Sequence, residues 1–264
     1  MTVCIAAKAD DGKALILAAD QMTTMMNVVT ETENATKILK LKENLYLLTA
    51  GGEFSAREMY KLASRNLKGT TTVEEAVPVV QRAFAKVKLD EAEAQFLAPR
   101  GLTISDFIDK QQSLNKDIAA MIDSQMINYA QPNNGNGVML LLAGINPDGE
   151  AKIYEFDPPG IYGEHAAFAA IGSGGTHTTN SLLARRYSAN QPEAEAVYLV
   201  FEAKKHSEVA PGVGRNTDMY LITKKGEKVY TEAELKKFAS IYDELISEER
   251  VLLKKKLQNG GEGS

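Results

Sequence analysis

The sequence predicts an α+β fold, a four-layer αββα sandwich of two antiparallel sheets covered by helices. Two observations predict it. Short apolar runs separated by turn signals fill the first fifty residues and return after residue 137, which is typical of hairpins and therefore of antiparallel sheets. Amphipathic segments with helical periodicity lie between and after these runs, and there are enough of them to cover both sheets with helices. Hydrophobic residues make up 44% of the 264-residue chain and charged residues 25%, as in ordinary globular domains.

The first hairpin is predicted at the very start of the chain. The apolar runs Val3 to Ala7 and Ala14 to Ala19 flank Asp10-Asp11-Gly12, which suits a three-residue loop with glycine in the left-handed position. In that register Thr2 lies opposite Asp20. A polar pair is thus expected at the open end of an otherwise apolar hairpin.

A second hairpin is predicted from Ala35 to Leu41 and Leu45 to Gly51, joined by Lys42-Glu43-Asn44 with asparagine in the left-handed position. This register places Lys37 opposite Thr49. Lys37 is the only charge on its strand face. A buried ammonium is costly unless it is paired, so Lys37 needs a carboxylate partner or a chemical task.

The middle and the end of the chain are predicted to alternate between helices and strands. Thr72 and Glu75 have the form of a capping box at the start of a helix that runs to Phe96. We interpret residues 1–230 as one domain with a helical insertion at about 99–131, followed by a C-terminal helical extension at 231–258 and a flexible tail at 259–264. The remaining predictions are a helix after Gly52, an amphipathic stretch after Thr103, strands at 138–145, 151–156 and 167–171, helices from 175 through 187 and over 192–206, and a hairpin of 218–223 with 228–230.

Charge and composition exclude several classes of function. The formal net charge of −5 and the pI near 5.4 give no electrostatic footprint for nucleic acid or anionic lipid. One cysteine cannot form an internal disulfide, and three histidines far apart in sequence make a transition-metal site improbable. Because no segment has the length of a membrane helix or the form of a signal peptide, we expect a cytoplasmic protein without a cofactor.

Several short blocks, in this order and spacing, resemble the proteasome β-type peptidases, which are N-terminal nucleophile (Ntn) hydrolases. The resemblance covers roughly residues 2–90 and 137–230, and the Met-Thr start is closest to the bacterial HslV and Anbu branch. The blocks are Met1-Thr2-Val3-Cys4-Ile5-Ala6-Ala7, Leu17-Ala18-Ala19-Asp20, Lys37-Ile38, Leu48-Thr49-Ala50-Gly51, Leu142-Ala143-Gly144-Ile145, Ile171-Gly172-Ser173-Gly174, Thr217-Asp218 and Ile222-Thr223.

The resemblance implies a catalytic role for Thr2 once Met1 is removed, with Asp20 and Lys37 as the family's acid and lysine beside it. The chemistry is reasonable on its own terms. A threonine hydroxyl needs a neighbouring base, and an N-terminal amine with a pKa of about 7.7 to 8 is a base already attached to it. A nearby ammonium favours the neutral amine, and a carboxylate keeps that ammonium charged.

The resemblance also implies that the backbone N–H of Gly51 forms the oxyanion hole and that Ser173 lies near the nucleophile. A cap of the following helix is an equally good interpretation of Ser173. Cys4 is interpreted as a small buried residue and not as a thiol nucleophile, because no histidine accompanies it in the sequence. The segment Ser207 to Gly214 lacks the family's aspartate and serine, so Ser207 or Glu208 would have to replace them.

The predicted function is a threonine-type peptidase that cleaves peptide bonds through an acyl-enzyme. Its substrate would be a peptide or an unfolded protein. The resemblance implies a homo-oligomer, either a ring or a stacked assembly, and leaves the existence of an unfoldase partner open. Two alternatives remain: an Ntn amidase that acts on a small-molecule amide, and a catalytically silent structural or binding subunit, which retention of Met1 would favour.

Overall fold

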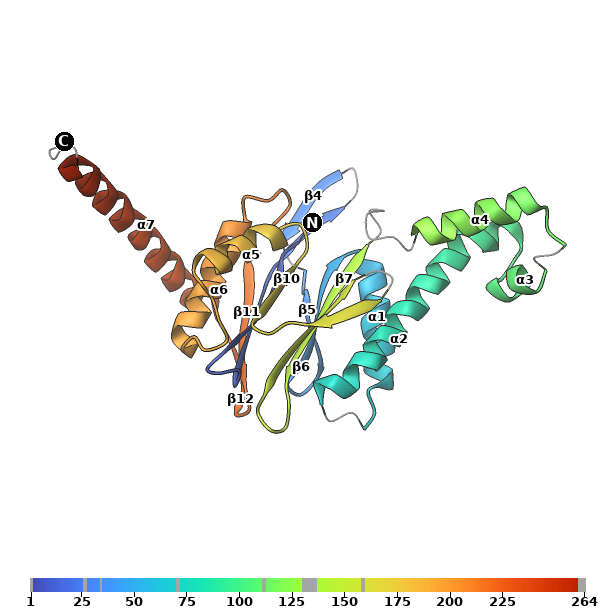
Figure 1. Cartoon of the computed structure of the whole chain (residues 1–264), viewed down its shortest axis with the longest axis horizontal. Helices are drawn as coiled ribbons and strands as arrows, with labels where there is room; N and C mark the ends of the chain where they lie inside the picture. The colour runs from blue at the N-terminus through green and yellow to red at the C-terminus, as the bar shows by residue number, and fades with distance from the viewer. Residues whose placement is uncertain are drawn as a thin grey trace.

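The computed structural model describes residues 2–25, 28–33, 35–69, 72–110, 113–129, 137–157 and 160–260. Two five-stranded antiparallel sheets form its centre (Figure 1). In spatial order, the first sheet contains β10 (Phe168–Ile171), β1 (Cys4–Ala9), β2 (Ala14–Asp20), β11 (Thr217–Thr223) and β12 (Gly226–Val229). The second contains β5 (Ile38–Lys42), β6 (Leu45–Gly51), β7 (Val138–Ile145), β8 (Ala151–Asp157) and β9 (Ile161–Glu164). A separate pair, β3 (Met22–Met25) and β4 (Val28–Glu33), follows β2.

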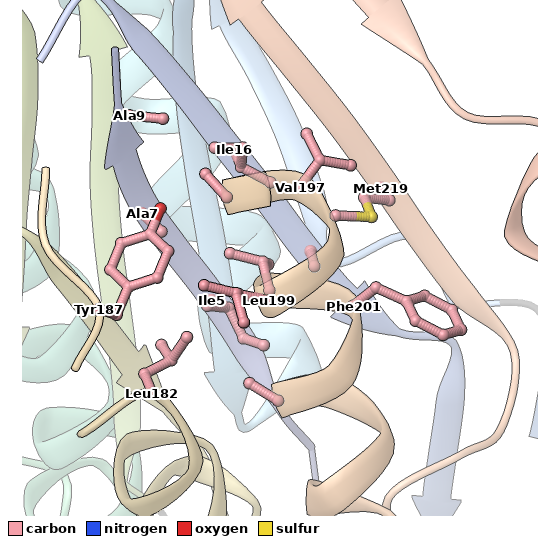
Figure 2. Packing of buried hydrophobic residues seen from close by; sticks show 14 of the residues in the cluster. Ile5, Ala7, Ala9, Ile16, Leu182, Tyr187, Val197, Leu199, Phe201 and Met219 are labelled. Carbon is pink, nitrogen blue, oxygen red and sulfur yellow. The ribbon is translucent and has the colours of Figure 1, made fainter. Parts of the chain in front are cut away.

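Helices cover the outer face of each sheet, which confirms the predicted αββα sandwich. On the first sheet, α5 (Gly175–Ala184) and α6 (Glu193–Ser207) pack through Leu182, Val197 and Val200 onto Ile5 and Ile16 (Figure 2). On the second, α1 (Glu53–Asn66) and α2 (Val73–Ala92) pack against β6, β7 and β8. The layer between the sheets consists largely of alanine, leucine and isoleucine.

The predicted helix from Thr72 to Phe96 forms with two adjustments. Its capping box is present, because the Thr72 side chain and the Glu75 backbone and side chain bond reciprocally. Regular α-helix ends at Ala92, and a π-helical turn at Glu93–Leu97 continues it. A change from α to π geometry within one helix is not visible in the periodicity of the side chains, so the sequence predicted one continuous helix.

The register of the first hairpin differs by one residue from the prediction. Ala9 pairs with Ala14, so the loop has four residues and Val3, not Thr2, lies opposite Asp20. The cause lies in the turn: Asp10, Asp11 and Gly12 all have positive φ (52°, 54° and 77°), and the Lys13 N–H closes it on the Asp10 carbonyl at 3.1 Å. Asparagine and aspartate tolerate this conformation better than most residues. Thr2 therefore lies just beyond the end of the ladder.

The register of the second hairpin is as predicted at Lys37 and Thr49, but it shifts between Lys40 and Lys42, so that Lys42 pairs with Leu45 next to the turn. The Thr49 N–H donates to the Lys37 carbonyl oxygen at 3.1 Å, and Asn44 adopts a φ of 56° in the turn. The strands β3, β4 and β9 are additions that the apolar runs did not reveal. The last hairpin also turns earlier than predicted, since Thr223 already pairs with Gly226.

Two helical projections extend from opposite ends of the sandwich (Figure 1). At one end, α3 (Ile104–Asp109) and α4 (Lys116–Tyr129) share a small core of Leu97, Phe107 and Ile122. At the other, α7 (Glu232–Gly260) runs away from the body. It continues two residues into the predicted tail, whose remaining residues, 261–264, lie outside the described part of the chain. None of the described helices is both long and apolar enough to cross a membrane.

Candidate active site

A buried carboxylate, that of Asp20, lies at the centre of the site. Its Oδ1 accepts hydrogen bonds from the Lys37 ammonium and from the Val3 N–H, both at 2.8 Å. Its Oδ2 accepts from the N–H groups of Met22 at 3.1 Å and Gly214 at 3.0 Å. Asp20 is fully buried, and four donors of this kind replace the water that a carboxylate loses on burial. The last residue of β2 thus connects three separate segments.

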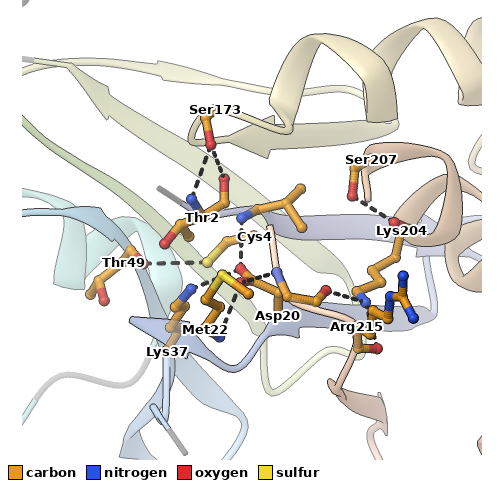
Figure 3. A network of polar contacts seen from close by, with 12 residues as sticks. Thr2, Cys4, Asp20, Met22, Lys37, Thr49, Ser173, Lys204, Ser207 and Arg215 are labelled. Atoms are coloured by element: carbon orange, nitrogen blue, oxygen red, sulfur yellow. Dashed lines mark hydrogen bonds and ion pairs between the residues drawn. The ribbon is translucent and has the colours of Figure 1, made fainter. Parts of the chain in front are cut away.

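Lys37 lies immediately before β5 and is buried. Its ammonium forms an ion pair with Asp20, which confirms that this lysine has a carboxylate partner. Asp20 Oδ1 accepts hydrogen bonds from both the Lys37 ammonium and the N–H of Val3. Because Val3 directly follows Thr2, the carboxylate links Lys37 to the backbone next to Thr2. Figure 3 shows the Thr2 side chain on the same side of the site as Lys37 and Thr49, away from Ser173.

The loop that follows β10 holds the backbone of Thr2. The Thr2 nitrogen donates to Ser173 Oγ at 3.1 Å, and Ser173 Oγ donates to the Thr2 carbonyl oxygen at 3.4 Å. The Gly174 N–H donates to the same carbonyl at 3.1 Å. A Cβ on Gly172, whose φ is +91°, would collide with this carbonyl group and lie 2.9 Å from its carbon. The loop can approach Thr2 this closely only because position 172 is glycine.

Of the two interpretations of Ser173, the helix cap is wrong. The residue that caps α5 is Gly174, and no side chain forms a cap hydrogen bond there. The Ser173 hydroxyl instead bonds the Thr2 backbone on both sides of the residue. A serine before a helix is ambiguous in sequence, since both uses need the same hydroxyl one or two residues from the helix start.

Gly51 ends β6 at the same edge of the site. Its φ is +99°, and a Cβ there would collide with the Gly137 carbonyl group, 3.1 Å from its carbon. Its neighbour Ala50 approaches the loop that holds Thr2, because a Cβ on Gly172 would lie 3.4 Å from the Ala50 Cβ. The end of β6 and the nucleophile candidate therefore flank the same glycine loop.

Cys4 lies close to this cluster but has the properties of an inert thiol. It is fully buried, and its Sγ donates to the Thr49 carbonyl oxygen at 3.3 Å. Burial raises the pKa of the Cys4 thiol to about 12, although the charge of Lys37 opposes the shift. A thiol of this kind is neutral at physiological pH, in keeping with its interpretation as a packing residue.

We expect native Cys4 to resist alkylation and to react only when the protein unfolds. At pH 9 the raised pKa lowers the thiolate fraction on the order of several hundredfold relative to an unperturbed cysteine, before any steric protection is counted. Iodoacetamide labelling followed by mass spectrometry, with and without denaturant, measures this. Labelling of the native protein at the rate of the denatured chain would contradict the assignment.

A buried cation that sequence reasoning missed lies at the end of α6. Lys204 is fully buried, and its ammonium donates to Glu208 Oε1 at 2.7 Å and to the carbonyl oxygens of Gly214 and Arg215, each at 2.8 Å. Burial lowers the Lys204 pKa, and Glu208 opposes this shift. A lysine on the apolar stripe of a helix is the sequence signal that identifies such a residue.

The two predicted replacements for the family's aspartate and serine do not bond the Ser173 loop directly. The Ser207 hydroxyl donates to the Lys204 carbonyl of its own helix at 2.6 Å. Glu208 pairs with Lys204 and Lys205. Glu208 thus reaches the site through Lys204, which bonds the carbonyl oxygens of Gly214 and Arg215. Within the described residues, no group of three or more His, Cys, Asp and Glu side chains is arranged to hold a metal ion.

Comparisons with known proteins find similarity to proteasome subunits. A family described as "Proteasome subunit" matches residues 108–222. A protein of Nanoarchaeum equitans named "Proteasome subunit beta" is 29% identical over 237 residues, which span 89% of this chain and 100% of that protein. A protein of Aeropyrum pernix named "Proteasome subunit alpha" is 39% identical over 66 residues, a quarter of each chain.

Proposed function

Because the chain has the proteasome β-type fold, we propose that it is a threonine-type peptidase of the HslV and Anbu-like branch, with Thr2 as the nucleophile. The observation that carries the proposal is the Asp20 carboxylate, which joins the Lys37 ammonium to the backbone beside Thr2. The relationship to proteasome β-type subunits supports a hydrolase. The specific arrangement of Thr2, Asp20 and Lys37 supports N-terminal nucleophile chemistry over other hydrolytic mechanisms.

The proposed reaction begins after Met1 has been removed. The freed Thr2 amine accepts the proton of its own hydroxyl, and Oγ1 attacks the carbonyl carbon of the scissile peptide bond. The Lys37 ammonium lowers the proton affinity of the amine and stabilises the developing alkoxide, while Asp20 compensates the buried ammonium. Ser173 and the Gly172 loop hold the Thr2 backbone in place during the attack.

The tetrahedral intermediate places a negative charge on the former carbonyl oxygen, and the Gly51 N–H is proposed to donate to it. Loss of one such donor commonly lowers the rate by about 10² to 10³-fold. Collapse of the intermediate breaks the C–N bond, and the departing amine takes the proton from the Thr2 ammonium. Water, deprotonated by the same amine, then attacks the acyl-enzyme ester, and release of the carboxylic acid restores the Thr2 hydroxyl.

The proposed substrate is an extended peptide or an unfolded protein. Thr23, Ala35 and Thr49, which are proposed to shape the pocket for the residue before the cleaved bond, are small and select no particular side chain. We further propose a homo-oligomeric ring or stack. In support, apolar side chains are exposed on both projections, for example Ile118 on α4 and Leu257 on α7. A cytoplasmic location and the absence of a cofactor remain part of the proposal.

The direct test of this function is hydrolysis by a series of Thr2 variants. Wild-type protein is expected to degrade an unfolded protein such as casein and short fluorogenic peptides. Thr2→Ala should abolish both activities, because it removes the nucleophile, whereas Thr2→Ser should retain part. Thr176→Ala, on the exposed side of α5, is the matched control and should leave activity unchanged.

The alternatives give different results in the same assay. A small-molecule amidase would hydrolyse simple amides and leave casein intact, with the same dependence on Thr2. A silent subunit would hydrolyse nothing and would keep Met1. Activity that survives Thr2→Ala would contradict the proposed nucleophile.

A further inference from the structure

Lys204 is a buried cation that the proposed reaction does not use. It lies on α6 on the outer side of the first sheet, and its side chain is completely enclosed. A buried ammonium is costly unless its hydrogens find acceptors. Its three hydrogens have three: Glu208 Oε1 and the carbonyl oxygens of Gly214 and Arg215. Two of these belong to consecutive residues of the segment between α6 and β11.

The segment that Lys204 holds, at Gly214 and Arg215, also supplies a hydrogen-bond donor to Asp20. Lys204 holds Gly214 by its carbonyl oxygen, and Asp20 Oδ2 holds the same residue by its N–H at 3.0 Å. Two residues further on, the Asn216 carbonyl accepts from the Gln21 N–H at 3.3 Å. Gly214 is buried and belongs to no helix or strand. Its position therefore depends on these side-chain contacts more than on regular backbone pairing.

The same turn of α6 also touches the loop that holds Thr2. A Cβ on Gly174 would lie 3.1 Å from the Ser207 Cβ, and the Ser207 hydroxyl is fixed on the Lys204 carbonyl. Figure 3 shows Lys204, Ser207 and Arg215 on the opposite side of Asp20 from Thr2 and Lys37. Lys204 cannot take part in bond making from this position, but it can set where Asp20 sits.

We propose that Lys204 is a positioning residue for the active site, which fixes the Gly214 amide and through it the Asp20 carboxylate that orients Lys37. The proposal deepens the proposed function and rests on it, since the reaction needs Lys37 close to the Thr2 amine. The Gly214 amide donates to a carboxylate, which makes it one of the stronger hydrogen bonds of the site.

The test compares two adjacent lysines that share a partner. Lys204→Met removes the ammonium and all three contacts at nearly constant volume. Lys205→Met removes the same charge and the other Glu208 contact, Nζ to Oε2 at 2.8 Å, but no contact to Gly214 or Arg215. Two quantities are measured: hydrogen exchange of the Gly214 amide, and the rate constant of Thr2 acylation by a peptide epoxyketone, counted per titrated active site so that unfolded protein does not contribute.

In Lys204→Met we expect Gly214 to exchange at least about tenfold faster and acylation to slow by about tenfold, the effect of one charge-assisted hydrogen bond. The dissociation constant for reversible binding of the probe should stay unchanged, because the peptide pocket is untouched. Lys205→Met should match wild type in every quantity. If Lys204→Met fails to fold, Lys204→Gln, which keeps one donor for one carbonyl, should show the same effects at smaller size.

The outcomes separate this inference from the proposed function. Equal Gly214 exchange in the Lys204 and Lys205 variants overturns the positioning role, whether or not the wild type reacts. Faster Gly214 exchange with an unchanged acylation rate overturns it as well, since the amide would then not matter for Lys37. If Gly214 exchanges faster in Lys204→Met but the wild-type protein never reacts with the epoxyketone, the proposed function is contradicted. The role of Lys204 in holding the Gly214 amide on Asp20 is then still supported.

Discussion

Lys37→Met is expected to lower peptide hydrolysis by about 10³-fold or more, the largest effect of any substitution outside Thr2. The ammonium is needed to keep the Thr2 amine unprotonated and to stabilise the alkoxide. The substitution also leaves Asp20 buried and without its cation. Removing one partner of a buried pair typically costs about 3 to 5 kcal/mol, so the melting temperature should fall together with activity. Assays below the lowered melting temperature measure the catalytic loss alone.

Two variants distinguish catalysis from stability in this prediction. Asp20→Asn combined with Lys37→Met removes both charges and should recover part of the lost stability while activity stays absent. Lys40→Met removes a lysine of the adjoining strand β5 whose ion pair with Glu227, at 2.9 Å, is solvent-exposed. Such a pair contributes about 1 kcal/mol or less, so Lys40→Met should be close to wild type. Substantial hydrolysis by folded Lys37→Met would contradict the role assigned to the ammonium.

Gly172→Ala is expected to lower peptide hydrolysis by about 10²-fold, because it moves Thr2. The added Cβ would collide with the Thr2 carbonyl group, which is backbone and cannot rotate away. A shift of about 1 Å at a nucleophile can cost about 10²-fold in rate. The left-handed φ of +91° adds a strain of roughly 1 to 2 kcal/mol. Peptide hydrolysis measures the loss of rate, and a crystal structure of the variant shows the displacement of Thr2.

The matched control for this prediction is Gly12→Ala. Gly12 also has a positive φ, +77°, but nothing lies within 4 Å of the position its Cβ would take. Gly12→Ala should therefore show the backbone strain without the collision, that is, a somewhat lower melting temperature and full activity. Equal loss of activity in both variants would mean that strain, and not displacement of Thr2, is responsible.

The layers of the fold could be predicted from the sequence because each one depends on local patterns. Apolar runs flanking Asn44 or Asn146-Pro147-Asp148-Gly149 specify hairpins, and Thr72 with Glu75 specifies a helix start. The register of the first hairpin could not be predicted, because three successive residues with positive φ are rare outside glycine. The one-residue error moved Thr2 out of the ladder without separating it from Asp20, since the carboxylate reaches the Val3 backbone.

The candidate site was predictable where side chains carry the chemistry, and not where the backbone does. Lys37 stood out as a lone charge on an apolar face, and its partner proved to be Asp20. The donors from Met22 and Gly214 could not be foreseen, because every residue but proline has an N–H and only the fold decides which one meets a carboxylate. Lys204 could have been recognised by its place on the buried stripe of α6, but two of its three acceptors are again backbone carbonyls.

The most direct test of the central claim is the intact mass of the purified protein before and after treatment with a peptide epoxyketone, with fragmentation to locate the adduct. We predict a chain that lacks the mass of one methionine, gains one inhibitor, and carries it on the N-terminal threonine through both its nitrogen and its hydroxyl oxygen. A chain that keeps its first methionine and stays unmodified, or one modified at any other residue, would contradict the claim.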